Sequence, residues 1–177
     1  GVFAPGGHGP RPRGGPPRAL GSGGAGVSAG GGLVGGVVAA SERRRGKAPT
    51  LEDVATRYDV DGYEIWVGRS ARGNDTLSLK LARPRDLWFH VAGSPGSHVI
   101  IRRETGDDAP PRAVLERAAG LAVWHSKARE ARGKVPVHWC EAADVSKARG
   151  APAGQVRLRR YEVLRVYPRA GAPRDGA

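Results

Sequence analysis

The segment 86–101 holds the residues of this chain that are best suited to chemistry. Two apolar runs flank a Gly-Ser-Pro-Gly turn, and each run carries a histidine at or beside the turn, His90 and His98. Aromatic and β-branched runs on either side of Gly and Pro are typical of two strands joined by a tight connection. The pattern predicts a hairpin that gathers two imidazoles, one carboxylate and two serines near one end.

Asp86 and His90 are predicted to act as a pair. Alternate residues of a strand share a face, so Asp86, Trp88 and His90 point the same way. A carboxylate that accepts a hydrogen bond from one imidazole nitrogen fixes the tautomer, and the ring can then address a phosphate, a 2′-OH or a base edge. In the structural alternative, which stays open, Asp86 and His90 only satisfy the loop backbone.

The turn before His98 is predicted to bind an anion. Gly96 allows a close approach of the backbone to a ligand, and exposed N–H groups in such a turn can form an anion-binding nest. The alternative is a turn in which Ser94 and Ser97 bond their own backbone.

The same cluster has a catalytic interpretation. Asp86, His90 and His98 could form the ligand set of a metal-dependent enzyme, or an acid/base set, that acts on RNA. Their spacing matches no metal motif, His125 and His138 are not expected nearby, and no serine lies in a Gly-x-Ser-x-Gly elbow. We therefore expect a binding protein without catalytic residues, metal or cofactor, and keep the RNA-processing enzyme as the alternative.

Composition divides the chain near residue 41. Residues 1–41 contain three Arg and no Asp or Glu, and are dominated by Gly, Ala and Pro. Such a segment buries too little apolar surface to offset its ordering entropy, so we expect a disordered leader, similar in part to an organellar transit peptide. From Glu42 onward, 26 basic residues face all 17 acidic ones, which gives +9 of the total +12. This balance makes a polyanion the leading partner class.

The single cysteine, Cys140, excludes an internal disulfide and a cysteine-based zinc site, and it fits a reducing compartment. No apolar run approaches the roughly 18 residues that a membrane helix needs. We expect no membrane partner, and a location in the cytoplasm or in an organelle such as the chloroplast. Because the sequence begins with Gly, we expect the true N-terminus to lie outside it.

The rest of the sequence predicts an α+β domain with a mixed or antiparallel sheet of about five or six strands, one main helix and one short helix. The expected organisation is a basic linker over 42–56, a folded domain over 57–168 and a flexible tail over 169–177. Local signals predict a cap at Thr50, a hairpin at Asp61-Gly62 and a short helix capped by Asn74. The main helix is expected from Pro111 to about Arg129. A strand is expected over 135–140, where Pro136 indicates either an edge strand or the beginning of the strand, and an alternating segment over 155–167 is expected to contain a bulge near Arg160.

Basic side chains on glycine-containing loops are phosphate-contact candidates, because RNA reaches loops most easily. They are Arg69, Arg72, Lys147 and Arg149, with Lys80, Arg157 and Arg159 as further candidates. The four tryptophans, Trp66, Trp88, Trp124 and Trp139, could stack on bases, but their places in apolar runs favour core packing.

Four segments in order resemble the NFACT RNA-binding domain, called NFACT-R. They are Asp61-Gly62-Tyr63-Glu64-Ile65-Trp66-Val67-Gly68-Arg69, Asn74-Asp75-Thr76-Leu77-Ser78, Asp86-Leu87-Trp88-Phe89-His90 with Pro95-Gly96-Ser97-His98-Val99, and Lys147-Ala148-Arg149-Gly150-Ala151-Pro152-Ala153-Gly154-Gln155-Val156. In this family the domain sits on the C-terminal side of large ribosome quality control factors.

The resemblance implies a free-standing module that engages rRNA or tRNA on the large ribosomal subunit, in quality control of stalled translation. It implies RNA contacts at Arg69, Arg72, Asn74, Asp86, His90, Pro95, Gly96, Ser97, His98, Lys147 and Arg149. A protein-interaction adaptor that docks through an exposed strand edge near Pro136 is a third possibility.

Overall fold

The computed structural model describes residues 46–104, 106 and 108–174. The predicted leader over 1–41 lies outside the described residues, as does the start of the linker. The elements in chain order are α1 (Leu51–Val54), β1 (Ala55–Val60), β2 (Tyr63–Gly68), α2 (Ala71–Thr76), the π-helical turn η1 (Leu77–Leu81), β3 (Leu87–Val91), β4 (Val99–Ile101), α3 (Arg112–Trp124), β5 (Val135–Glu141), the 3₁₀ turn η2 (Ala142–Asp144), β6 (Val145–Ser146), β7 (Arg157–Leu158) and β8 (Glu162–Val166).

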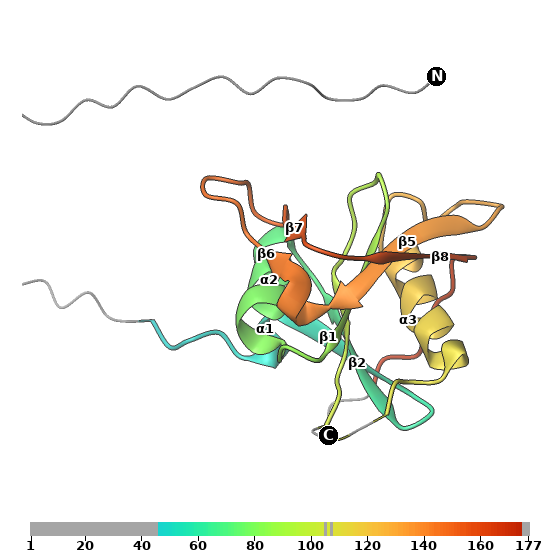
Figure 1. Ribbon diagram of the computed structural model, residues 1–177, viewed down its shortest axis with the longest axis horizontal. Coiled ribbons are helices and arrows are strands. Elements are labelled where there is room, and N and C mark those ends of the chain that lie inside the picture. The colour runs from blue at the N-terminus through green and yellow to red at the C-terminus, as the bar shows by residue number, and fades with distance from the viewer. Residues whose placement is uncertain (1–45, 105, 107, 175–177) are drawn as a thin grey trace, which may run out of the picture. The chain divides into compact units, whose positions relative to one another are not determined.

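Six strands form one antiparallel sheet in the order β1-β2-β4-β3-β5-β8, and β6 pairs with β7 in a second, small sheet. Helix α3 covers one face of the large sheet, while α1, α2 and η1 lie on the other side (Figure 1). The predicted α+β class, with one main helix and one short helix, is confirmed. The predicted β3–β4 hairpin is present, with Phe89 opposite Val99.

Strand alternation builds an apolar cluster on each face of the sheet. Phe89 and Val91 face α3 and are fully buried with Leu121, whereas Trp66 and Trp88 belong to the opposite cluster. Burying a large apolar side chain contributes about 1.5–3 kcal/mol. Of the tryptophans predicted to pack in the core, Trp66 and Trp88 are buried, Trp139 stacks on Phe89, and the half-buried Trp124 lies under the Arg129 guanidinium.

The helix ends agree with the sequence prediction in part. Thr50 caps α1 in a capping box with Asp53, as expected. The expected Asn74 cap of the short helix is wrong, because the cap lies four residues earlier, at Ser70, whose Oγ accepts a hydrogen bond from Gly73 N at 2.9 Å. Helix α3 ends at Trp124 instead of near Arg129.

Strand β5 is internal, since it pairs with β3 on one side and β8 on the other. Pro136 therefore marks the beginning of a strand, and the adaptor hypothesis loses the exposed edge on which it depended. The predicted bulge near Arg160 is also wrong. The alternation over 155–167 breaks there because the chain leaves β7 in the small sheet and enters β8 in the large one.

Residues after β8 run back along the folded unit. Arg169 N donates to Gly120 O on α3 at 3.1 Å, and Arg174 N donates to Arg57 O on β1 at 2.7 Å. These contacts join part of the expected tail to the domain. Within the described ranges, none of the helices has the length and apolar character that crossing a membrane requires.

Candidate nucleic-acid interface

His98 is the centre of a buried hydrogen-bonded chain. Its Nε2 lies 3.1 Å from Gly154 O and its Nδ1 lies 2.7 Å from Ser78 Oγ, which also accepts from Trp88 Nε1 at 2.9 Å. A carbonyl oxygen can only accept, so Nε2 carries the proton and Nδ1 accepts from the Ser78 hydroxyl. His98 thus joins β3, η1 and the β6–β7 loop, and at 1% exposure it cannot present its ring to a large ligand.

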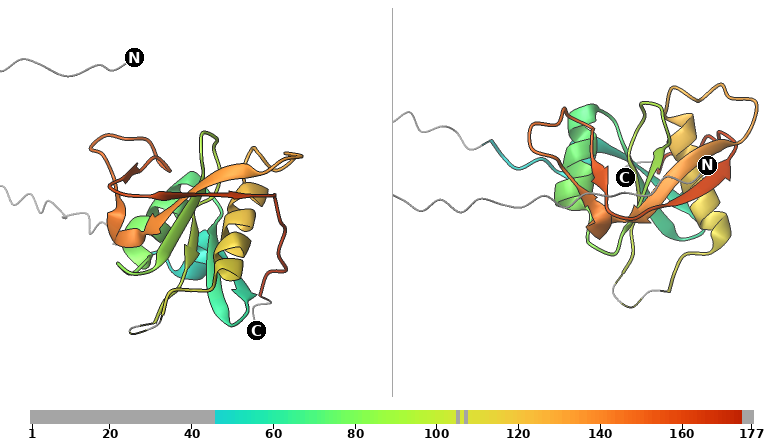
Figure 2. Two further views of the ribbon diagram at one scale, coloured as in Figure 1. Left: turned by 45° about the vertical axis from the view of Figure 1, so that its right-hand side comes forward. Right: turned by 45° about the horizontal axis from the view of Figure 1, so that its top comes forward.

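Asp75 holds the same loop from the other side. Its carboxylate accepts from Lys147 Nζ at 2.9 Å and from Gly154 N at 3.0 Å, while Lys147 also donates to Pro152 O. Gly154 adopts φ +82°, a conformation that disfavours side chains. The basic loop after β6 is therefore held through both backbone polar groups of Gly154, its N–H by Asp75 and its C=O by His98. In the ribbon views of Figure 2 this loop lies beside α2.

Asn74 anchors the start of β4. Its Oδ1 accepts from His98 N at 3.1 Å, and its Nδ2 donates to Gly96 O at 3.4 Å. A Cβ atom on Gly68 would lie 2.0 Å from Asn74 Oδ1. The glycine of the Val67-Gly68-Arg69 segment is therefore required for the close approach of this amide.

The environment of His98 keeps the ring neutral. Burial, followed by the neighbouring His90 ring, lowers the pKa of His98 to about 4. Burial and then His138 also lower the pKa of His90. Neither imidazole is charged at neutral pH, so these two rings act through hydrogen bonds and stacking, and the positive charge of the site must come from arginine and lysine.

We expect the free energy of unfolding to fall by about 3 kcal/mol as the pH drops from about 6.5 to about 4. The pKa of His98 is 6.5 in the reference state and about 4 when folded, so the unfolded chain binds more protons in this window. The stabilisation is fully present above the reference pKa and is lost toward the folded pKa. Urea denaturation across this range measures it. His98→Gln should be less stable at neutral pH but show a shallower decline; an equal slope would contradict the assignment.

Asp86 has partners other than His90. Its Oδ2 accepts from Arg83 N at 2.7 Å and from Arg102 Nη1 at 3.0 Å, and its Oδ1 accepts from Arg103 N at 2.9 Å. The expected pairing with His90 is wrong, because Asp86 lies just before β3, at the end remote from the turn. Fully buried, this carboxylate fixes the start of β3 to the end of β4.

The turn over 94–97 is packed against the end of α3. Ser97 N donates to His125 O at 2.9 Å, and Lys127 N donates to Pro95 O at 3.0 Å. A Cβ atom on Gly96 would lie 2.6 Å from Ser126 Cβ. The predicted anion nest therefore loses the Ser97 N–H, and the close approach that Gly96 permits is to the protein's own backbone.

An open groove follows the face of the sheet between this turn and the basic loop. It consists of two adjoining hollows that share His90, Gly154 and Gln155. The first, of about 550 Å³, is lined by Arg69, Ser70, Ala71, Asn74, His90, Ser94, Pro95, Gly96, Ser97, His125, Ala153, Gly154 and Gln155. The second, of about 400 Å³, is lined by Trp88, His90, His98, His138, Gly154, Gln155, Val156, Leu158 and Tyr161. The groove thus brings together predicted site residues from two separate segments, 69–74 and 90–97.

Sequence reasoning missed His138 and Tyr161, and it wrongly set His125 and His138 apart from the cluster. His138 lies directly opposite His90 in the β3–β5 register, and Tyr161 packs on His138 with ring centroids 4.3 Å apart. His125 lines the first hollow. The strand register is what places His138 beside His90. In the sequence, the alternation of His138 with the apolar Val137 indicates only that the two side chains lie on opposite faces of the strand.

The basic candidates divide into paired and exposed side chains. Arg69 donates to the carbonyl oxygens of Ala55 and Glu52, and Lys147 is bound to Asp75. Arg69 is exposed as well, but these carbonyl groups hold its guanidinium, whereas Arg72 and Arg149 are exposed and make no side-chain hydrogen bond or ion pair with the described residues. Arg69 and Lys147 shape the groove, and the guanidinium groups of Arg72 and Arg149 are the ones placed to meet phosphate.

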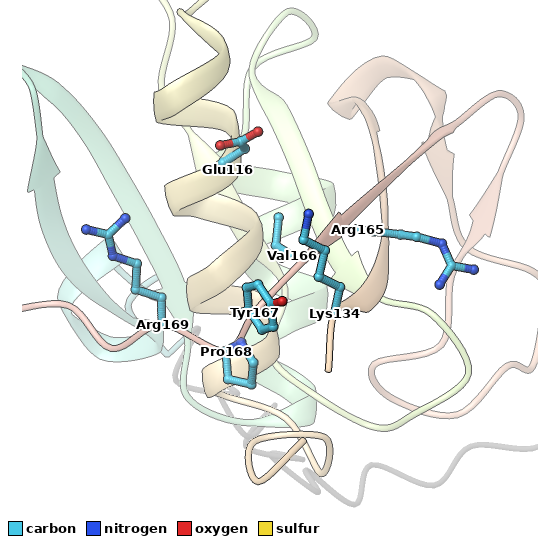
Figure 3. Close-up of a pocket in the computed structure, with 7 residues that line it drawn as sticks. All are labelled: Glu116, Lys134, Arg165, Val166, Tyr167, Pro168 and Arg169. Carbon is cyan, nitrogen blue, oxygen red and sulfur yellow. The ribbon is translucent and has the colours of Figure 1, made fainter. Parts of the chain in front are cut away.

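A separate hollow of about 320 Å³ lies between α3 and the end of β8 (Figure 3). It is lined by Glu116, Lys134, Arg165, Val166, Tyr167, Pro168 and Arg169. Lys134 Nζ lies 5.8 Å from the centre of the Tyr167 ring, while Arg165 and Arg169 point away to either side. None of the residues predicted from the sequence to bind RNA lines it.

The catalytic alternative is not supported by these contacts. Asp86 is engaged with the backbone and Arg102, and His98 uses both ring nitrogens inside the fold. In the part of the chain that the structure describes, no group of three or more His, Cys, Asp or Glu side chains is placed to hold a metal ion. Cys140 is buried, and burial raises the pKa of its thiol to about 12, as befits a packed side chain.

The fold and the site together define a small α+β domain in which a fastened basic loop and one open sheet face enclose a groove. The chain belongs to the NFACT protein RNA binding domain family, which matches residues 54–160. It is similar to the Rqc2 homolog RqcH of Streptococcus suis, with 40% identity over 104 residues, 59% of this chain and 18% of that protein.

Two further relatives and a solved structure agree. The Rqc2 homolog RqcH of Bacillus subtilis is 34% identical over 69% of this chain and 20% of its own length. The ribosome quality control complex subunit NEMF homolog of Drosophila melanogaster is 33% identical over 54% of this chain and 9% of its own. The C-terminal structure of the fibronectin/fibrinogen-binding protein from Streptococcus suis matches with a TM-score of 0.60 and 36% identity, covering 73% of this chain and 51% of that one. The chain spans about a fifth of the two bacterial relatives' length.

Proposed function

We propose that the groove beside the β6–β7 loop binds RNA, and that the RNA is rRNA or tRNA on the large ribosomal subunit. The observation that carries the proposal is the combination, in one open groove, of the half-buried rings of His90 and His138 and the exposed Tyr161, with the exposed rim arginines Arg72 and Arg149 on the two elements that border it, α2 and the β6–β7 loop. Guanidinium groups bind phosphates, and aromatic rings stack on splayed bases. The names of the relatives, which are ribosome quality control proteins, support the ribosomal setting.

Arg72, Arg149 and the ring of His90 are the residues predicted from the sequence that the RNA would touch. Asn74, His98 and Lys147 would act indirectly, since their polar atoms bind within the fold. Gly96 and Ser97 would set the wall of the groove. The proposed task in quality control of stalled translation is therefore one of recognition, with no bond broken.

We expect RNA binding to weaken steeply with salt. If three or four phosphates are neutralised, raising KCl from about 50 to about 200 mM should weaken binding roughly 20- to 50-fold, because released counterions must be recaptured. Fluorescence anisotropy with a labelled RNA measures this directly. Absence of binding at the lower salt concentration, or an affinity that does not change with salt, would contradict the proposed function.

A further inference from the structure

The hollow around His138 and Tyr161 is lined largely by aromatic rings. One wall is the sheet, with Trp88 and His138, and the other is the chain from Gln155 to Leu158. Tyr161 also lines the hollow, and its ring is tilted 38° to that of His138. The volume of this hollow, about 400 Å³, lies within the range of small-ligand sites.

Large apolar and aromatic side chains beside this hollow are exposed to solvent. Tyr161 is 51% exposed and its neighbour on the strand, Val163, is 52% exposed. Val163 lies opposite His138, so the two share a face of the sheet. An apolar, aromatic surface beside a groove rimmed by arginines is typical of a binding site. The exposed Gln155 offers an amide that can both donate to and accept from a base edge.

We propose that this hollow accepts one unpaired nucleobase, stacked on the exposed ring of Tyr161 that packs on His138, so that the domain selects single-stranded RNA over duplex RNA. This inference rests on the proposed RNA binding and adds the substrate class. A base within an A-form duplex is stacked on its neighbours, and the deep, narrow major groove hides its edge, so only a splayed base can enter a side-chain pocket. The rim arginines contact phosphates of either form, whereas the rings discriminate.

The chain offers a matched control for this stacking role. Tyr167 is 58% exposed, close to the exposure of Tyr161, but lines the separate hollow beside Lys134. Removing either ring should leave the fold intact, because neither side chain is buried. Tyr161→Phe keeps an aromatic face and removes only the hydroxyl.

The test uses the full chain with a labelled RNA of about 12 nucleotides without self-complementarity, and the same strand annealed to its complement. Wild type should bind the single strand more tightly. Tyr161→Ala should weaken single-strand binding roughly tenfold and leave duplex binding unchanged. The single-strand affinities of Tyr161→Phe and Tyr167→Ala should stay within about twofold of wild type.

Three results would overturn the inference. If wild type binds single strand and duplex equally and Tyr161→Ala has no effect, RNA binding stands and the base pocket fails. If Tyr161→Ala weakens both forms equally, the ring contributes without selecting. If wild type binds neither form, the proposed function fails with it. Melting temperatures of all variants should agree, which separates a binding loss from unfolding.

Discussion

Asp86→Asn is expected to lower the free energy of unfolding by about 3 kcal/mol and to leave the RNA affinity of the folded protein unchanged. The carboxylate accepts two backbone N–H groups and the Arg102 guanidinium while fully buried. An amide would turn a donor toward one of these donors and leave the nearly buried Arg102 charge, whose side chain is 11% exposed, without its counter-ion.

Urea denaturation gives the stability, and anisotropy at low temperature, where the variant remains folded, gives the affinity. Asp61→Asn is the matched control: it removes the same charge at an exposed turn with φ 52°, which asparagine tolerates. The control should be close to wild type in both measurements. An Asp86→Asn protein of normal stability and weak RNA binding would instead support the role that the sequence suggested for this residue.

The triple variant Arg72→Glu, Arg149→Glu and Arg157→Glu is expected to weaken RNA binding by about 100-fold or more at low salt. Each reversal replaces an attraction to phosphate with a repulsion, and the three positions lie on α2, the β6–β7 loop and β7, which border the groove. All three side chains are exposed, so the fold should survive.

The control reverses three exposed arginines away from the groove: Arg85→Glu, Arg112→Glu and Arg174→Glu. Both triple variants lower the net charge from +12 to +6, so a general loss of attraction affects them alike. We expect the control to weaken binding by less than about tenfold. Equal losses in the two variants would mean that RNA responds to the overall charge of the protein and has no preferred face.

The parts of the fold that depend on local signals could be predicted from the sequence. The apolar runs around the turn at 92–98 predict the β3–β4 hairpin, and Asp61-Gly62 predicts the β1–β2 hairpin; both are present. The long apolar periodicity before Trp124 predicts the main helix. In each case the residues that make the contacts are close in the chain, so propensity and alternation determine the outcome.

The site depended on pairings that the sequence does not reveal. Strand β5 inserts beside β3, and this places His138 opposite His90. Asp86 was assigned to His90 by its spacing, but the β3–β4 register brings Arg102 and Arg103 closer. Asp75, on the short helix α2, binds Lys147 in a loop that is distant in the sequence. The partner of a buried polar side chain depends on which segments the fold brings next to it. A single sequence does not show these long-range contacts.

The most direct test of the RNA-binding face is ultraviolet crosslinking of the protein to bound RNA, followed by mass spectrometry of the crosslinked peptides. Aromatic rings in contact with bases crosslink efficiently, so the map reports which face the RNA touches. We predict crosslinks at Tyr161 and His138, and further crosslinks in the loop over 147–156. Crosslinks confined to Trp124 and Tyr167, beside α3, would contradict the account.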